Sequence, residues 1–171
     1  MGQQGKHLNS IKVSHEKHTA GCATEIMAIP ETVCISMSQH IGAPCKPLVK
    51  KGDQVKVGQL IGDTDAFVSA PIHSSVSGTV KEISTIRSVT GGDDQVVIIE
   101  TDGNQDVYEE IKPPVINDMK DFIAAVRASG LVGLGGASFP THIKLNPKNL
   151  EEVDTLIVNA AECEPFITSD H

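Results

Sequence analysis

The sequence predicts a mixed α+β chain in two parts, in which an all-β barrel or sandwich is followed by the beginning of an α/β domain. Short β-rich runs separated by Gly, Pro and Asp turns fill residues 32–99, and near residue 119 the apolar period changes to that of a helix. A glycine-rich stretch, GLVGLGGASFPT, then separates the predicted helix from a later apolar run. This order of elements indicates α/β organisation in the second part.

The first part begins after a polar arm. Residues 1–28 have no apolar period, and we expect them to be loose or draped over another surface. An all-β domain is predicted over residues 29–112, with β-rich runs at 33–37, 54–57, 66–70, 78–83 and 95–100. Within it, VKKGDQVKVGQLIG at 49–62 and SAPIHSSVSGTVKEI at 69–83 each pair a glycine turn with valines that alternate with polar residues, as in short hairpins.

The second part, residues 113–171, begins at a Pro-Pro pair, which places the boundary near Lys112. Apolar residues recur from Met119 to Val126 at i, i+3, i+4 and i+7, which predicts a helix that begins at Asn117 or Asp118 and stops at Gly130. Pro140 is expected to begin a short second helix. The run DTLIVN at 154–159 is typical of a buried parallel strand.

Composition excludes several classes of function. The 171-residue chain has a formal net charge of −8, 3% aromatic residues and no Trp, which argues against a nucleic-acid-binding surface. No apolar run is long enough to span a bilayer, so we expect no transmembrane segment and, at a membrane, attachment through a partner. The four cysteines stand singly, so we expect reduced thiols and neither a metal site nor an iron–sulfur cluster in this chain.

The glycine-rich stretch at 130–141 has two interpretations. As a structural turn, it needs its glycines only for positive φ. As a binding loop, it uses Gly133, Gly135 and Gly136 to let a ligand lie directly against the backbone, and the following helix start and Lys144 bring positive potential to a phosphate.

Polar residues follow the predicted strand at 154–159. Ligands of α/β sheets bind beyond the carboxyl ends of strands, where Asn159, Glu162 and Glu164 would stand. An Asn amide can pair with the polar atoms of a heterocyclic ring, and a carboxylate can accept hydrogen bonds from ribose hydroxyls. A solvated acidic loop explains the same residues, and both interpretations remain open.

The two glycine and valine stretches of the β domain resemble the halves of a biotinyl or lipoyl carrier domain, a flattened barrel-sandwich hybrid. Carrier domains present a modifiable lysine on the hairpin between the halves. The equivalent segment here, residues 63–68, contains no lysine, and Lys81 lies in a predicted strand. We therefore expect the fold without the carrier chemistry.

A second resemblance covers residues 30 to 171. GLVGLGGASFPTHIKLNP followed by VDTLIVNAAECEPFITSDH, with SQHIGAPCKPLVKKGDQVKVGQLIG upstream, resembles the C subunit of the Rnf complex, an ion-translocating assembly that passes electrons between NADH and ferredoxin. The resemblance implies an NADH-oxidising flavoprotein subunit of an oxidoreductase, with FMN as cofactor and NADH as substrate. Its implied partners are the other Rnf subunits, including membrane-embedded ones, and ferredoxin as partner of the complex.

The same resemblance implies a peripheral position on the cytoplasmic face of the cell membrane. Members of the family are considerably longer than this chain, and their cysteine-ligated 4Fe–4S clusters lie toward the carboxyl end. We therefore expect this chain to be an amino-terminal fragment, inactive by itself, in which the clusters belong to the missing part.

A more distant resemblance is to the FMN- and NADH-binding subunit of respiratory complex I, whose loop reads GxRGRGGAGFPTGxKW and whose later strand ends NADExEPG. It implies that residues 113–171 are the first part of a Rossmann-like FMN/NADH-binding domain. Carried over by position, Gly133, Gly135 and Gly136 face the FMN phosphate and the nucleotide, and Lys144 pairs with the phosphate. Asn159 contacts the flavin, and Glu162 and Glu164 lie on the flavin and NADH side. Leu134, Ser138, His142 and Ala161 depart from that pattern.

Hydride transfer to a flavin needs no acid, base or nucleophile from the protein, so no catalytic residue is nominated. Other functions remain open. The β domain could be a docking module of the same complex, or the chain could come from a related electron-transfer protein, such as a reductase-associated one or the A subunit of the sodium-pumping NADH:quinone reductase. A biotinyl carrier is a distant third interpretation.

Overall fold

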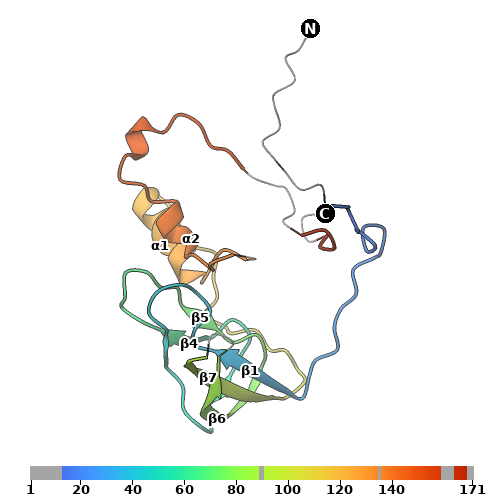
Figure 1. The fold of residues 1–171 in the computed structure, drawn as a ribbon. Helices are drawn as coiled ribbons and strands as arrows, with labels where there is room; N and C mark the ends of the chain where they lie inside the picture. Colours follow the sequence, from blue (N-terminus) through green and yellow to red (C-terminus); the bar gives the residue numbers. More distant parts are fainter. Residues whose placement is uncertain (1–12, 89–90, 135, 159–163, 169–171) are drawn as a thin grey trace. The chain divides into compact units, whose positions relative to one another are not determined.

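A computed structural model describes residues 13–88, 91–134, 136–158 and 164–168. The chain divides into two compact units. One unit is continuous and comprises Ala28–Val153, which carries both sheets and the helices labelled in Figure 1. The other comprises the segments before residue 28 and after residue 153.

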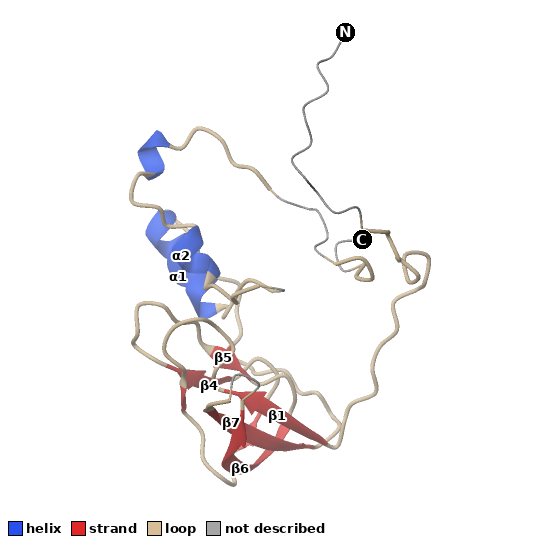
Figure 2. Ribbon diagram, in the orientation of Figure 1, coloured by secondary structure: helices blue, strands red, loops and turns tan. Residues whose placement is uncertain are grey.

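Two antiparallel sheets form the β part of the 28–153 unit, drawn in red in Figure 2. The four-stranded sheet has the order β1-β7-β6-β3, and the three-stranded sheet has the order β2-β4-β5. The strands are β1 (Thr32–Ser36), β2 (Lys46–Pro47), β3 (Gln54–Val55), β4 (Leu60–Asp63), β5 (Ile72–His73), β6 (Gly78–Arg87) and β7 (Asp93–Thr101). The longest pairing joins β6 to β7 and contains a register shift between Val80 and Glu82.

The two sheets contribute side chains to one apolar core. Its members come from strands of both sheets and from the loops between them: Ile35, Met37, Cys45, Val55, Ile61, Ile72, Val76, Val80, Val97 and Ile99. In β7, Val97 and Ile99 belong to this core, and Val96, on the opposite face of the strand, is fully buried outside it. The predicted all-β barrel or sandwich is confirmed.

The prediction of a strand at residues 66–70 is wrong. This segment is a loop between β4 and β5, and Phe67 at its tip is 83% exposed. The hydroxyl group of Ser69 donates to the backbone carbonyls of Ala66 (2.6 Å) and Thr64 (3.3 Å), so a side chain takes acceptors that a sheet partner would otherwise use. The short strands β2, β4 and β5 fall outside the predicted β-rich runs.

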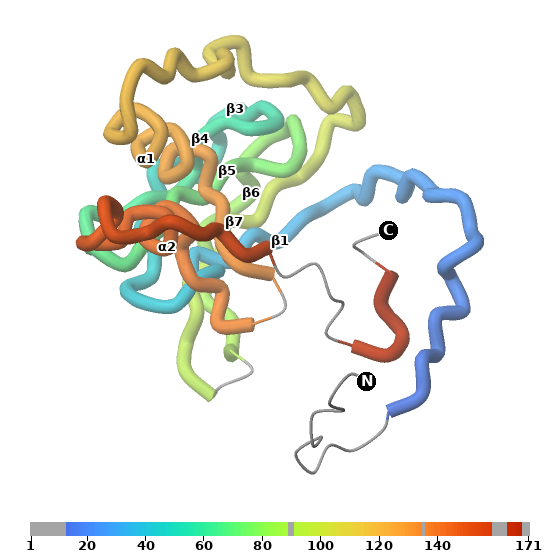
Figure 3. The backbone as a smooth tube through the Cα atoms, turned by 90° about the horizontal axis from the view of Figure 1, so that it is seen from above, coloured from blue at the N-terminus to red at the C-terminus, as the bar shows by residue number. Residues whose placement is uncertain are grey.

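The helical part follows a long connection from β7, drawn in yellow in Figure 3. Helix α1 (Met119–Ala128) begins at Asp118, whose carboxylate accepts a hydrogen bond from the backbone N–H of Asp121 at 2.8 Å, as predicted for an N-cap. Helix α2 (Thr141–Lys144) packs against α1, and a 3-10 turn covers Leu150–Glu152. These residues lie in the same compact unit as the sheets, so the domain boundary near Lys112 remains a prediction.

The predicted buried strand at 154–159 is not formed in the described part. Residues 154–158 have no regular structure, and Leu156, Ile157 and Val158 are 77–85% exposed. A parallel strand is stable only between neighbouring strands and under covering helices, and no strand of the described residues pairs with this run. Asn159 lies outside the described residues.

The amino-terminal arm contacts the carboxyl-terminal segment within the smaller unit. Residues 13–27 contain no helix or strand, as expected, but they are not free of contacts. The N–H of Glu16 donates to the carbonyl of Pro165 at 3.0 Å, and the hydroxyls of Thr19 and Thr168 lie 2.8 Å apart. Across the described residues of both units, no helix is long and apolar enough to cross a bilayer.

Candidate functional site

The glycine-rich loop starts from a fixed position at the end of α1. Gly130 has φ +72°, and its N–H donates to the carbonyl of Arg127 at 2.9 Å. A Cβ atom at Gly130 would lie 2.5 Å from the carbonyl oxygen of Pro71, closer than van der Waals contact allows. Glycine is therefore required here by both conformation and space, and the predicted helix stop is confirmed.

Backbone hydrogen bonds close the loop on itself. Val132 and Pro140 form an antiparallel bridge, and the N–H of Gly133 donates to the carbonyl of Phe139 at 3.0 Å. The N–H of Thr141 donates to the carbonyl of Leu131, also at 3.0 Å. The base of the loop is thus a short ladder, and residues 134 and 136–138 lie at its tip.

The tip of the loop faces solvent. Leu134 is 92% exposed, and nothing lies within 4 Å of the position that a Cβ atom of Gly136 would take. At the base, by contrast, Pro140 is fully buried. The loop therefore combines an anchored base with an open, side-chain-poor tip that a ligand can approach.

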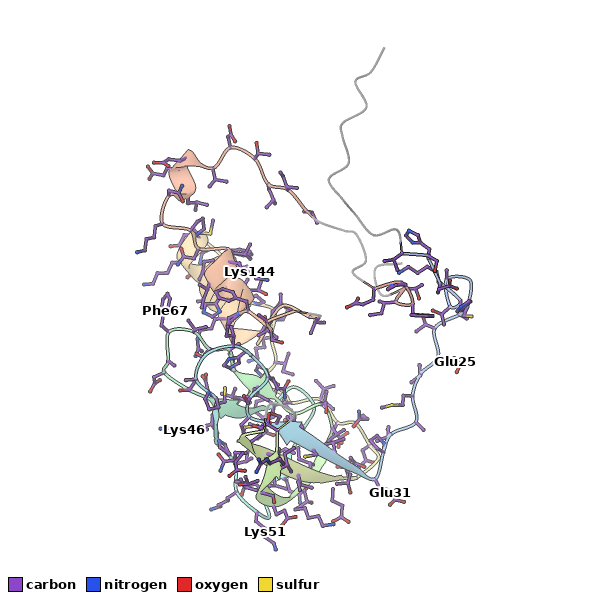
Figure 4. All side chains as sticks on the ribbon, in the orientation of Figure 1. Glu25, Glu31, Lys46, Lys51, Phe67 and Lys144 are labelled. Atoms are coloured by element: carbon purple, nitrogen blue, oxygen red, sulfur yellow. The ribbon has the colours of Figure 1, made fainter. Side chains whose placement is uncertain are left out.

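Lys144 lies over Gly133. Its Nζ is 3.1 Å from the position that a Cβ atom of Gly133 would occupy, so the ammonium group takes the space that glycine leaves empty. Figure 4 shows Lys144 on the ribbon of α2. The side chain is exposed, and among the described residues no carboxylate pairs with it. The sequence analysis predicted that Lys144 and Gly133 contact the same ligand, and the structure brings these two residues together.

Helix α2 is a single turn and supplies fewer free N–H groups than the sequence suggested. The N–H of Thr141 is bonded to Leu131 and that of Ile143 to the carbonyl of Pro140 at 3.2 Å. Positive potential at this loop therefore comes mainly from the Lys144 ammonium group.

A charged pair that sequence reasoning missed joins α1 to β4. Arg127 donates to both carboxylate oxygens of Asp63, at 2.9 and 3.3 Å, and to the carbonyl of Thr64 at 3.1 Å. Burial alone would raise the pKa of Asp63, but hydrogen bonds from Arg127 and from the Thr64 N–H lower that pKa overall. No local pattern could have revealed this pair, since its members are 64 residues apart.

His142 lies buried in the first turn of α2. Burial lowers its pKa, and the positive charge of Arg127 lowers it further. Its Nδ1 is the one buried side-chain nitrogen or oxygen without a hydrogen-bond partner among the residues that the structure describes. A neutral imidazole is therefore the stable form at this position near neutral pH.

The other predicted site residues, apart from Gly136, lie outside the described residues or in the smaller unit. Gly135, Asn159 and Glu162 lie outside the described residues. Glu164 is exposed and belongs to the smaller unit, where the Lys17 ammonium group donates to its backbone carbonyl at 2.7 Å. The described residues of the predicted site are therefore divided between the two units.

The cysteines and carboxylates form no metal centre in the described part of the chain, where no group of three or more His, Cys, Asp or Glu side chains lies close enough to hold an ion. Cys22, Cys34 and Cys45 are free thiols, and burial raises the pKa of Cys45. Cys163 falls outside the described residues. Lys81 lies exposed within β6 and not on a hairpin tip, which gives no support to carrier chemistry.

Two family models match the chain. The RnfC barrel sandwich hybrid domain matches residues 6–104, which include both sheets. The Nuo51 FMN-binding domain matches residues 126–171, which begin at the end of α1 and include the glycine-rich loop and Lys144.

Curated relatives match most of the chain. The C subunit of the proton-translocating ferredoxin:NAD(+) oxidoreductase complex of Clostridium ljungdahlii is 46% identical over 160 residues, which are 91% of this chain and 35% of the relative. The C subunit of the Na(+)-translocating complex of Acetobacterium woodii is 48% identical over 145 residues, 83% of this chain and 33% of the relative. The C subunit of an ion-translocating oxidoreductase complex of Rhodobacter capsulatus is 36% identical over 162 residues, 92% of this chain and 31% of the relative. The chain spans about a third of the length of these curated relatives.

Proposed function

The chain belongs to the RnfC family, the C subunits of the Rnf complex. We propose that its glycine-rich loop and Lys144 hold the phosphate of FMN, in a subunit that takes electrons from NADH. The observation that carries the proposal is the position of the Lys144 ammonium group over Gly133, inside the segment matched by an FMN-binding domain. A cation beside an exposed, glycine-rich stretch of backbone suits a phosphate monoester.

The residues present fit such a group. At Gly133 any larger side chain would enter the space of the ammonium group, and at Gly136 the backbone is open to solvent. We expect the phosphate oxygens to approach backbone at Gly133, Gly135 and Gly136 and to pair with Lys144. Asn159, Glu162 and Glu164 are proposed to complete the flavin and NADH side, on the grounds of sequence resemblance.

This arrangement assigns different roles to the cofactor and to the protein. Bound FMN would supply the redox chemistry, accepting a hydride from NADH and releasing electrons singly to iron–sulfur clusters. The protein anchors the phosphate through Lys144 and fixes its orientation with a loop closed by the Gly133 and Thr141 hydrogen bonds. No proton transfer by a side chain is required.

The wider assignment concerns the whole subunit, of which this chain matches about a third. We propose that the 4Fe–4S clusters are ligated by the part of the subunit beyond this chain. The proposed partners are the other Rnf subunits, some embedded in the membrane, and ferredoxin, with the protein on the cytoplasmic face. The two relatives with the higher identities carry names that specify different ions, proton and Na(+).

Titration of the purified chain with FMN, followed by flavin fluorescence, tests the proposal. Riboflavin, which lacks the phosphate, is the matched control ligand. Saturable FMN binding that riboflavin does not reproduce would support a phosphate site within these residues. Equal binding of both flavins would contradict a phosphate site. Binding of neither would contradict the proposal as a whole and favour the docking-module interpretation.

A further inference from the structure

By its sequence resemblance to a biotinyl carrier domain, the hairpin formed by β4 and β5 is the equivalent of the one that presents the modified lysine. Here that hairpin has an exposed phenylalanine at its tip, labelled Phe67 in Figure 4, and an aspartate at its base. The base is the part in contact with the helices: Asp63 ends β4 and His73 ends β5.

Asp63 holds the last turn of α1. Two hydrogen bonds from the Arg127 guanidinium group reach its carboxylate, and a third reaches the Thr64 carbonyl. The planar guanidinium group fits a carboxylate in one orientation, so the pair fixes direction as well as distance. Both side chains are about one-third exposed or less, which limits competition by water.

The same turn of α1 begins the glycine-rich loop. The carbonyl of Arg127 accepts the N–H of Gly130, and Gly130 lies directly against the hairpin at Pro71 and His73. On the far side of the loop, the N–H of Ile41 donates to the carbonyl of Ser138 at 3.4 Å. The loop is therefore attached to the β part at its beginning and again near its end.

Arg127 also acts on α2. Helix α1, which carries Arg127, packs against α2, and the positive charge of Arg127 adds to the effect of burial in lowering the pKa of His142. An Arg127 that lost its carboxylate partner would leave an uncompensated cation beside a buried imidazole. The position of α2, and with it that of Lys144, would then change.

We propose that the β4–β5 hairpin is the positioning element of the phosphate loop, and that Asp63 and Arg127 are positioning residues that hold Gly133 and Lys144 in register for the cofactor. The inference rests on the proposed FMN site for its functional meaning. Its structural content, that the pair orders the loop at residues 130–134 and 136–141, stands independently.

Variants of the whole chain test the inference through two readouts. Asp63→Asn, Arg127→Gln and the double variant are compared by amide hydrogen exchange at Gly133 and Thr141 and by FMN affinity. Glu109→Gln is the matched control, because it removes another carboxylate that pairs with a cation, Lys56, and neither partner belongs to α1 or to the loop. We expect each single variant to exchange about tenfold faster at Gly133 and Thr141 and to bind FMN about tenfold more weakly, and the double variant to add little. Exchange within β7 and in the control should stay unchanged.

Three results would overturn the inference that Asp63 and Arg127 position the loop. Unchanged exchange at Gly133 and Thr141 in both single variants would overturn the inference, and so would FMN affinity equal to that of the parent chain. Additive effects in the double variant would show that the two residues act separately, which also contradicts it. If the parent chain bound no FMN, the proposed function would fail while the exchange measurement still decided whether the pair orders the loop.

Discussion

Neutralising Lys144 should weaken FMN binding by a predictable and salt-dependent amount. An ammonium group about 4 Å from a unit negative charge gains ~1 kcal/mol in water. A phosphate monoester carries roughly 1.5 to 2 negative charges at neutral pH, and screening at physiological salt removes about half of the attraction. Because Lys144 is exposed, the water-like dielectric applies, and the net contribution is ~1 kcal/mol, or about fivefold in Kd.

Lys144→Gln is therefore expected to raise the Kd for FMN about fivefold, and Lys144→Glu about 30-fold, since reversal of charge doubles the change in energy. Flavin fluorescence at two salt concentrations measures both values, and the differences should shrink as salt is raised. Lys148→Gln, an exposed lysine four residues away with the same loss of charge, is the matched control and should have little effect. Equal weakening by Lys148→Gln and Lys144→Gln would refute the reasoning, because the effect would then be one of net charge alone.

Three further predictions concern the scaffold of the site. Gly130→Ala should destabilise the chain by at least ~1–2 kcal/mol through its positive φ alone, with a further cost from the contact with Pro71, and a lowered Tm checks it. The pKa of His142 is lowered in the folded chain, so the unfolded chain binds more protons and stability should fall as pH drops below ~6.5. His142→Phe should therefore flatten the plot of Tm against pH below ~6.5. A slope equal to that of the parent chain would contradict this prediction. Lys17→Ala should speed amide exchange in residues 164–168, where Lys17 donates to the Glu164 carbonyl, and unaltered exchange would argue against a role of the arm in ordering that segment.

Features set by local chemistry were predictable from the sequence. Asp118 caps α1 and Gly130 ends it, because a side-chain acceptor at one end and a positive φ at the other are demands that few residue types meet. The nearness of Lys144 to Gly133 was also predictable, since a tight loop and a single helical turn separate them.

Features set by distant contacts were not predictable. Residues 66–70 have the composition of a strand but lack a partner, and within the segment the Ser69 hydroxyl donates to the carbonyl of Ala66 instead. The apolar run at 154–158 needs neighbouring strands to be buried and is exposed without them. The Asp63–Arg127 pair depends on how the hairpin meets α1, for which neither residue carries a local signal.

The most direct test of the proposed phosphate site is a ¹H–¹⁵N spectrum of the chain titrated with FMN and, separately, with riboflavin. We expect the amide signals of Gly133, Gly136 and Lys144 to shift in proportion to FMN added and to shift much less with riboflavin, because the phosphate is the group that the loop holds. Shifts of these signals that are the same for both flavins, or shifts confined to the two sheets, would contradict the proposed site.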